Sequence, residues 1–131
     1  YSDVEEIKHI LATAPQKLSL NELYLVANSY ESGSKEFDDV FEVAVRMYPN
    51  DKIANLNAAN SAMHKRDLES AKEYLKRAGD SAEAVYARGA YAAMIEDYDT
   101  ARKLFKQAES KGLAQATAAL AELEVFINKQ K

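Results

Sequence analysis

Two segments of the chain, residues 67–78 and 97–108, repeat one pattern of residue types. Each begins with Asp and then places Ala, a large apolar residue and a second Ala at spacings of four and three, so that all three share one helical face. These residues are Ala71, Leu75 and Ala78 in the first segment and Ala101, Phe105 and Ala108 in the second. The small alanines allow a neighbouring helix to approach closely. Because a repeated helical unit indicates a stacked architecture, the sequence predicts an all-α fold of stacked antiparallel helical hairpins.

The pattern resembles the tetratricopeptide repeat (TPR), in which two helices carry large and small residues at set positions. The third hairpin matches through Val85, Gly89, Ala92, Tyr98, Ala101, Phe105 and Ala108. The second matches through Asn55, Ala58, Ala59, Ala62, Leu68, Ala71, Leu75 and Ala78. The first matches more loosely, through Leu23, Val26, Ala27, Tyr30, Phe37, Val40, Ala44 and Met47. The step from Ala71 to Ala101 is 101 − 71 = 30 residues, against about 34 in the standard repeat, so we expect a shortened link around Gly79.

Two further resemblances concern the origin of the chain. Residues 108–116 are similar to the repeat junction of Sel1-like proteins, a sister family of the same architecture. Residues 18–115 resemble the C-terminal part of larger cell-envelope proteins of Bacteroides-like bacteria, which implies the periplasm or cell envelope as its location. The absence of Cys is compatible with that location and with the cytoplasm. Since the chain begins at Tyr1 without Met or a secretory signal, we expect it to be a piece of a longer protein.

Helix start and stop signals predict eight helices in a single domain, residues 1–131. The expected parts are an N-terminal helix at 3–14, repeats at 19–48, 51–78 and 81–110, and a C-terminal capping helix at 113–129. Within them, Ser2 with Glu5 and Ser19 with Glu22 read as capping boxes. The second helix is expected to run to about Glu31. Residues Asp51, Asp67, Ser81 and Asp97 are expected to cap later helices.

The two terminal helices leave alternatives open. The first carries an apolar stripe of Val4, Ile7, Ile10 and Leu11, and it either folds onto the next two helices or closes a hairpin whose partner was cut away. The last carries Ala116, Leu120, Leu123 and Ile127 at helical spacing. It is expected to cover the end of the stack, as repeat arrays require. Alternatively, the apolar residues 125–127 dock a partner or the rest of the parent protein.

Composition argues against several functional classes. The 17 basic and 21 acidic residues are interspersed, so the chain lacks the basic stripe that nucleic-acid binding needs. No apolar run reaches the roughly 20 residues that span a bilayer, so direct membrane insertion is not expected. Neither His9 nor His64 has a second His four residues away, and the only carboxylate at that spacing is the single Glu5 before His9. No Gly-rich phosphate loop or Gly-x-Ser-x-Gly motif occurs. We therefore predict a non-enzyme that uses no cofactor or metal.

The TPR resemblance implies a binding surface, because the first helix of each hairpin in that family lines a concave groove. The corresponding side chains are Asn21, Tyr24, Asn28, Leu56, Asn57, Asn60, His64, Glu83 and Tyr86, with Ala90 beside them. Asn can pair with the backbone of an extended peptide, and Tyr can cover apolar side chains. The expected function is binding of a protein or peptide in this groove. The alternatives are that the asparagines only face solvent, or that the stack is a structural spacer or oligomerisation domain; the oligomeric state is open.

One TPR subtype grips the C-terminal carboxylate of chaperones with two Lys, one Arg and two Asn. The Asn positions correspond to Asn28 and Asn57, but the basic positions fall on Tyr24, Glu83 and Ala87. A carboxylate buried there would lack a cation, which costs several kcal/mol by order of magnitude. The sequence therefore disfavours a chaperone-tail clamp.

Overall fold

The computed structural model describes residues 3–130, over which the chain forms eight α-helices, one 3-10 turn and no strand. The elements are α1 (Val4–Thr13), η1 (Pro15–Lys17), α2 (Leu20–Ala27), α3 (Lys35–Met47), α4 (Lys52–His64), α5 (Leu68–Leu75), α6 (Ala82–Met94), α7 (Tyr98–Ser110) and α8 (Ala114–Lys129). The predicted all-α fold is confirmed. None of these helices is long and apolar enough to cross a membrane.

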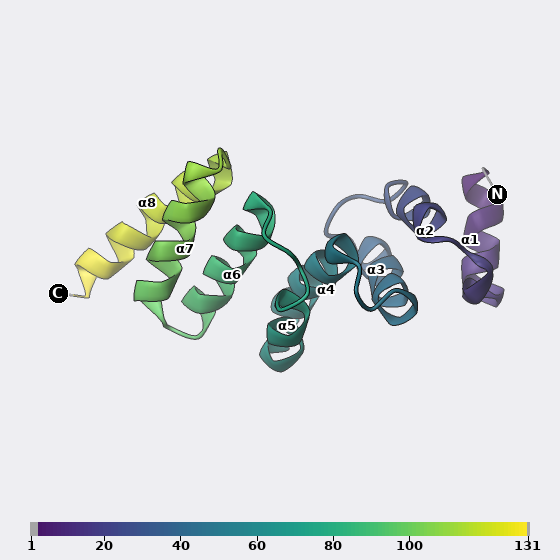
Figure 1. Ribbon diagram of the computed structural model, residues 1–131, viewed down its shortest axis with the longest axis horizontal. Coiled ribbons are helices and arrows are strands. Elements are labelled where there is room, and N and C mark those ends of the chain that lie inside the picture. The colour runs from purple at the N-terminus through teal and green to yellow at the C-terminus, as the bar shows by residue number, and fades with distance from the viewer. Residues whose placement is uncertain (1–2, 131) are drawn as a thin grey trace.

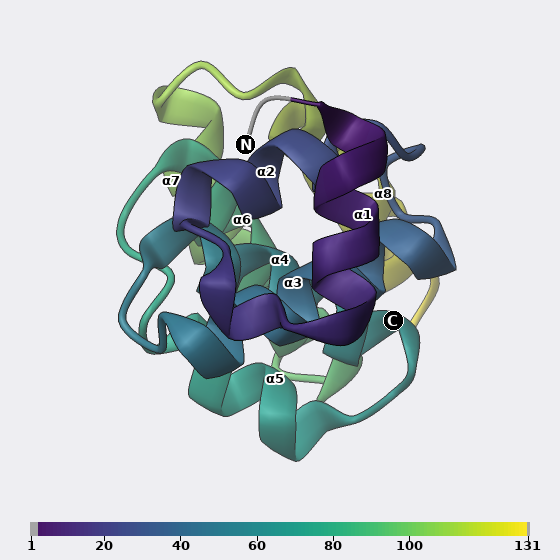
Figure 2. The ribbon, with the colours of Figure 1, turned by 90° about the vertical axis from the view of Figure 1, so that its right-hand side faces the viewer.

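Neighbouring helices pack as hairpins, which are α2 with α3, α4 with α5, and α6 with α7. Contacts of α3 with α4, α5 with α6, and α7 with α8 join successive units, and the first helices α4 and α6 also touch each other. The result is an elongated row with α1 and α8 at opposite ends (Figure 1). Viewed along its length, the helices are spread around the long axis rather than stacked in one column (Figure 2).

Small residues set the close packing of the hairpins. Ala59, Ala71 and Ala101 are buried where helices meet, and Phe105 lies in the core cluster of the third hairpin. At the N-terminal end, Ile7 is fully buried against the α2 and α3 core, with the rest of its stripe partly buried around it. The first helix therefore packs onto α2.

Most predicted caps are confirmed. Ser19 and Glu22 form a reciprocal capping box at the start of α2. The side chains of Asp51, Asp67, Ser81 and Asp97 each accept a backbone hydrogen bond at the start of α4, α5, α6 and α7. The prediction was wrong at α1, where Asp3 is the N-cap and accepts from the Glu5 amide at 3.0 Å. Ser2 lies outside the described residues.

The second helix ends earlier than predicted, at Ala27 rather than near Glu31. The Ser29 hydroxyl donates to the Val26 carbonyl at 2.6 Å, and the Tyr30 amide donates to the Ala27 carbonyl, so the last turn tightens and closes. The fifth helix likewise ends at Leu75 rather than continuing to Ala78. There the Arg88 guanidinium, which comes from α6, donates to the Leu75 carbonyl at 2.8 Å. Both endings depend on side chains that compete for helix carbonyls.

Candidate functional site

The candidate site is a hollow of about 380 Å³ centred on α4 and α6, called here the central hollow. Its lining residues are Ser32, Gly33, Phe37, Asp38, Leu56, Asn57, Asn60, His64, Glu83, Tyr86 and Gln115. Six of the nine predicted groove residues therefore lie around one space, namely Leu56, Asn57, Asn60, His64, Glu83 and Tyr86. The contact of α4 with α6 brings the four residues from α4 next to the two from α6, which are Glu83 and Tyr86.

The α4 wall presents its polar groups at helical spacing. The amide nitrogen of Asn57 donates to the Ile53 carbonyl at 3.0 Å, which leaves the Asn57 side-chain oxygen as an acceptor. The Asn60 side chain makes no hydrogen bond to any other residue of the described part of the chain and is half-buried. Asn60 can therefore both donate and accept within the hollow.

The α6 wall contributes a fixed aromatic ring. Tyr86 is half-buried and packs against Phe105 of α7, with ring centroids 5.5 Å apart and planes tilted by 38°. This contact holds the ring in place before any ligand arrives. Together with Leu56, it gives the hollow an apolar surface beside the asparagines.

Five lining residues were missed by the sequence interpretation: Ser32, Gly33, Phe37, Asp38 and Gln115. They come from the turn before α3, the start of α3, and the start of α8, none of which is a first helix of the three recognised hairpins. The TPR resemblance predicts Phe37 in the hairpin core, and it packs on Phe41 with ring centroids 4.8 Å apart. No local pattern distinguishes these residues, because their position follows from how the hairpins stack.

The hollow is acidic. Asp38 and Glu83 contribute carboxylates, and of the described residues that line it none is Lys or Arg. Lys65 lies nearby, and its ammonium pairs with Glu42 at 2.5 Å. That hydrogen bond, with weaker help from Asp38 and Asp39, raises the pKa of Lys65 against the opposing effect of burial. The Lys65 ammonium is thus paired with α3 and does not line the hollow.

The other three predicted residues, all on α2, do not line the hollow. Asn21 and Asn28 are exposed, and Asn28 is the C-cap of α2. Tyr24 is half-buried, packs on Phe41 with centroids 5.9 Å apart, and donates its hydroxyl to the Asp51 carboxylate at the start of α4. Burial, and then the hydrogen bond to Asp51, raise the pKa of Tyr24. Tyr24 thus links the first hairpin to the second.

A second, apolar hollow of about 420 Å³ continues along α6 toward α8. Ala90 and Ala93 form its α6 wall, and Phe126 closes it from α8. Phe126 is 41% exposed and packs on Tyr98 with centroids 5.1 Å apart, while Val125 is 55% exposed. The cluster at 125–127, for which docking is the alternative to a capping role, thus has two side chains open to solvent.

Among residues 3–130, no group of three or more His, Cys, Asp or Glu side chains is placed to hold a metal ion. No protein-family model matches the chain, and no curated protein is significantly similar to it in sequence. Function is therefore argued from the geometry and chemistry of the site.

Proposed function

We propose that this chain is a non-catalytic, TPR-like interaction module that binds an extended segment of a partner protein in the central hollow. The supporting observation is that α4 and α6 bring six side chains of the predicted row around one space of about 380 Å³. An extended segment has unpaired backbone amides and carbonyls, which need donors and acceptors, and side chains that need apolar surface. Asn57 and Asn60 supply the first, and Leu56 and Tyr86 the second.

The hollow is suited to binding because its walls are held in advance. Tyr86 is fixed by Phe105, and Asn57 by the Ile53 carbonyl. Side chains that are already ordered lose little entropy when a ligand binds, so more of the contact energy is available as affinity. The cell-envelope location, as part of a larger bacterial protein, belongs to the same proposal and rests on the sequence resemblance.

The test compares peptides recovered from a random display library by the wild type and by the double variant Asn57→Ala/Asn60→Ala. Alanine has the highest helix propensity, so α4 should stay folded. Asn21→Ala is the matched control, because Asn21 is an exposed asparagine on a first helix that does not line the hollow. We expect enriched peptides to bind the double variant at least about tenfold more weakly and the control as well as the wild type.

A structural role is the second candidate, and the elongated row with α1 and α8 at opposite ends favours it (Figure 1). A rigid spacer would need no ligand in the hollow. In that case the wild type and the double variant would enrich the same background peptides, and the binding proposal would be wrong.

A further inference from the structure

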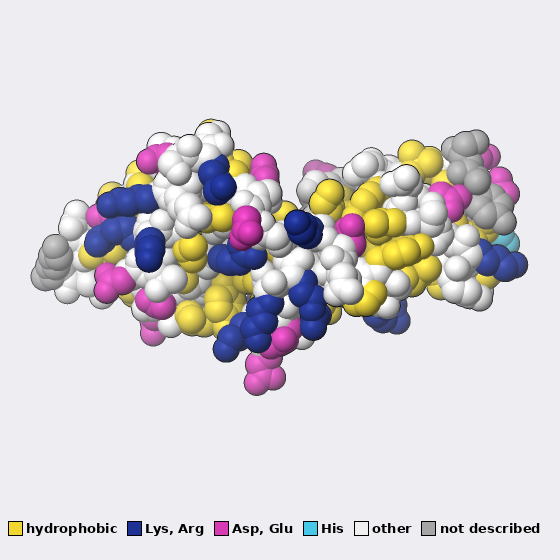
Figure 3. Space-filling model, viewed as in Figure 1, with side chains coloured by type: hydrophobic (Ala, Val, Ile, Leu, Met, Phe, Trp, Pro, Cys, Tyr) yellow, Lys and Arg dark blue, Asp and Glu magenta, His cyan; other side chains and the backbone are white. Residues whose placement is uncertain are grey.

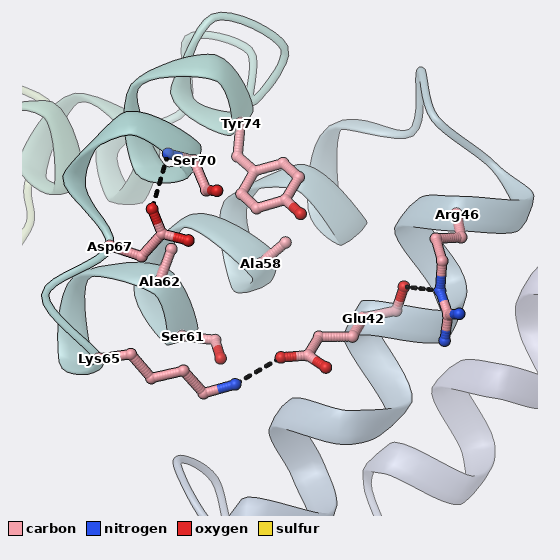
Figure 4. Close-up of a pocket in the computed structure, with 9 residues that line it drawn as sticks. All are labelled: Glu42, Arg46, Ala58, Ser61, Ala62, Lys65, Asp67, Ser70 and Tyr74. Atoms are coloured by element: carbon pink, nitrogen blue, oxygen red, sulfur yellow. Dashed lines mark hydrogen bonds and ion pairs between the residues drawn. The ribbon is translucent and has the colours of Figure 1, made fainter.

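Two clefts outside the central hollow occupy corresponding positions in successive hairpins. The first cleft, of about 250 Å³, lies between α3, α4 and α5 and includes Glu42, Arg46, Ser61, Lys65, Ser70 and Tyr74 (Figure 4). The second cleft, of about 320 Å³, lies between α5, α6 and α7 and includes Lys72, Lys76, Tyr91, Ile95, Thr100 and Leu104. Each of the nine residues that line the first cleft has a counterpart 30 positions later in the second.

The shape of both clefts follows from the repeat. Helices α4 and α6 begin 82 − 52 = 30 residues apart, and α5 and α7 begin 98 − 68 = 30 residues apart. The same backbone arrangement therefore produces the same recess twice. What differs between the clefts is the chemistry of the side chains.

The first cleft is polar and electrically balanced. The ammonium of Lys65, the C-cap of α4, pairs with the Glu42 carboxylate on α3 at 2.5 Å, and this ion pair crosses the recess (Figure 4). The hydroxyl of Tyr74 belongs to the same lining. The first cleft thus satisfies its own charges.

The second cleft lacks this bridge. Lys72 stands where the first cleft has Glu42, Ile95 replaces Lys65, and Leu104 replaces Tyr74. The floor is accordingly apolar, and Ile95 holds a large aliphatic side chain 47% exposed to water. Ile95 thus places apolar surface beside Leu104 at the position where the first cleft has a paired lysine.

The rim of the second cleft is basic. Its lining includes the cations Lys72, Lys76 and Arg88 and a single carboxylate, that of Asp97, which caps α7. Arg88 donates to the carbonyls of Leu75 and Gly79, and its guanidinium also lies 3.7 Å from the exposed carboxylate of Asp80. Lys76 pairs with exposed Glu73 at 3.0 Å, and both of these exposed ion pairs are weak contacts. Lys72 makes no ion pair with any residue in the described part of the chain. Figure 3 shows Lys and Arg side chains over α5 and α6 bordering hydrophobic ones.

From this charge pattern we propose that the second cleft docks an acidic amphipathic helix of a partner protein. Lys72 lies in the last turn of α5 and Lys76 is the C-cap of that helix, four residues later, so their side chains are spaced to meet two carboxylates one turn apart on the partner helix. The apolar stripe of that helix covers Ile95 and Leu104. This site is separate from the central hollow, and the proposal does not depend on peptide binding there.

The test measures the fluorescence anisotropy of a labelled helical peptide of about 18 residues, which carries Glu pairs four residues apart beside a Leu stripe. The variant Lys72→Glu/Ile95→Lys gives the second cleft the residues of the first. We expect it to bind the peptide at least about tenfold more weakly, with circular dichroism unchanged because both positions are exposed. The reciprocal variant Glu42→Lys/Lys65→Ile gives the first cleft the residues of the second. We expect each chain of this variant to bind two peptides, where the wild type binds one.

Matched peptides with Lys in place of Glu should not bind, and raising the salt concentration should weaken binding. The variant Asn57→Ala/Asn60→Ala should bind like the wild type, which separates this site from the hollow. The proposal is overturned if the wild type does not bind the acidic peptide, or if Lys72→Glu/Ile95→Lys binds it equally well. Dodecanoate, a fatty acid with one carboxylate and an apolar tail, is tested beside the peptide. Binding of dodecanoate without binding of the peptide would also overturn the proposal.

Discussion

Gly89 lies inside α6 against the ring of Phe105. A Cβ at this position would lie 2.7 Å from two ring carbons of Phe105, closer than side chains tolerate. The second hairpin has Ala59 and Leu75 at the corresponding positions, 30 residues earlier. Each hairpin thus pairs one larger and one smaller residue, and the larger Phe105 requires the smaller Gly89.

We expect Gly89→Ala to destabilise the fold by about 1 kcal/mol, since the cost of overpacking exceeds the gain in helix propensity. The double variant Gly89→Ala/Phe105→Leu recreates the pair of the second hairpin. Its loss in unfolding free energy, measured by urea denaturation, should be at least about 0.5 kcal/mol smaller than the sum of the two single losses. Strict additivity would show that the two residues do not constrain each other.

Tyr24 belongs to the packing of the first two hairpins, so Tyr24→Ala would remove core contacts and is unsuitable as a binding probe. Tyr24→Phe keeps the ring on Phe41 and removes only the hydrogen bond to Asp51. We expect it to lower the unfolding free energy at neutral pH by about 1 kcal/mol.

The raised pKa of Tyr24 also predicts a pH dependence. Above about pH 10 the unfolded chain loses the phenol proton while the folded chain keeps it, so stability falls as pH rises through that range. Urea denaturation between pH 8 and 11 should show this loss in the wild type and a shallower one in Tyr24→Phe. Identical slopes would mean that the hydroxyl is not held in the folded state.

At the scale of elements, the same turn joins α4 to α5 and α6 to α7. Arg66 and Glu96, each between the two helices of a hairpin, adopt positive φ angles of 62° and 64°. The following Asp67 and Asp97 donate their amides to Ala62 and Ala92, both at 2.8 Å. The left-handed conformation is costly for a residue with a Cβ, so neither turn uses the residue that suits it best.

We therefore expect Arg66→Gly and Glu96→Gly each to stabilise the protein by about 0.5 kcal/mol, after the entropy cost of glycine in the unfolded chain. Glu69→Gly, in the first turn of α5, is the control and should cost about 1 kcal/mol, because it puts a glycine in a helix and removes an acidic side chain from the helix start. Thermal melting measures all three. A loss of stability in both turn variants would indicate that Arg66 and Glu96 make contacts that outweigh the strain.

At the scale of the whole molecule, contacts run chiefly between successive helices, so stability should vary along the row. Leu23 on α2 and Leu123 on α8 are buried near opposite ends. Each Leu→Ala change should cost about 2–3 kcal/mol. We expect hydrogen exchange to rise in α6–α8 for Leu123→Ala and in α1–α3 for Leu23→Ala. A uniform rise in both variants would mean that the stack unfolds as one unit.

The sequence alone determined the helices and their repeat. Caps such as Ser19 and Asp51, and the spacing of Ala71 and Leu75, depend on neighbours within four residues, so local pattern was sufficient. The early end of α5 could not be predicted from the local sequence, because the side chain that bonds its last carbonyl, Arg88, comes from the next helix.

Only the tertiary structure decided which residues share a site. It placed six of the nine predicted side chains around the central hollow, added Asp38 from α3 and Gln115 from α8, and left Tyr24 in the packing between hairpins. It also brought residues from three helices together in each cleft. Such neighbours are set by the angle and distance at which whole hairpins pack, and those depend on side chains far apart in the chain.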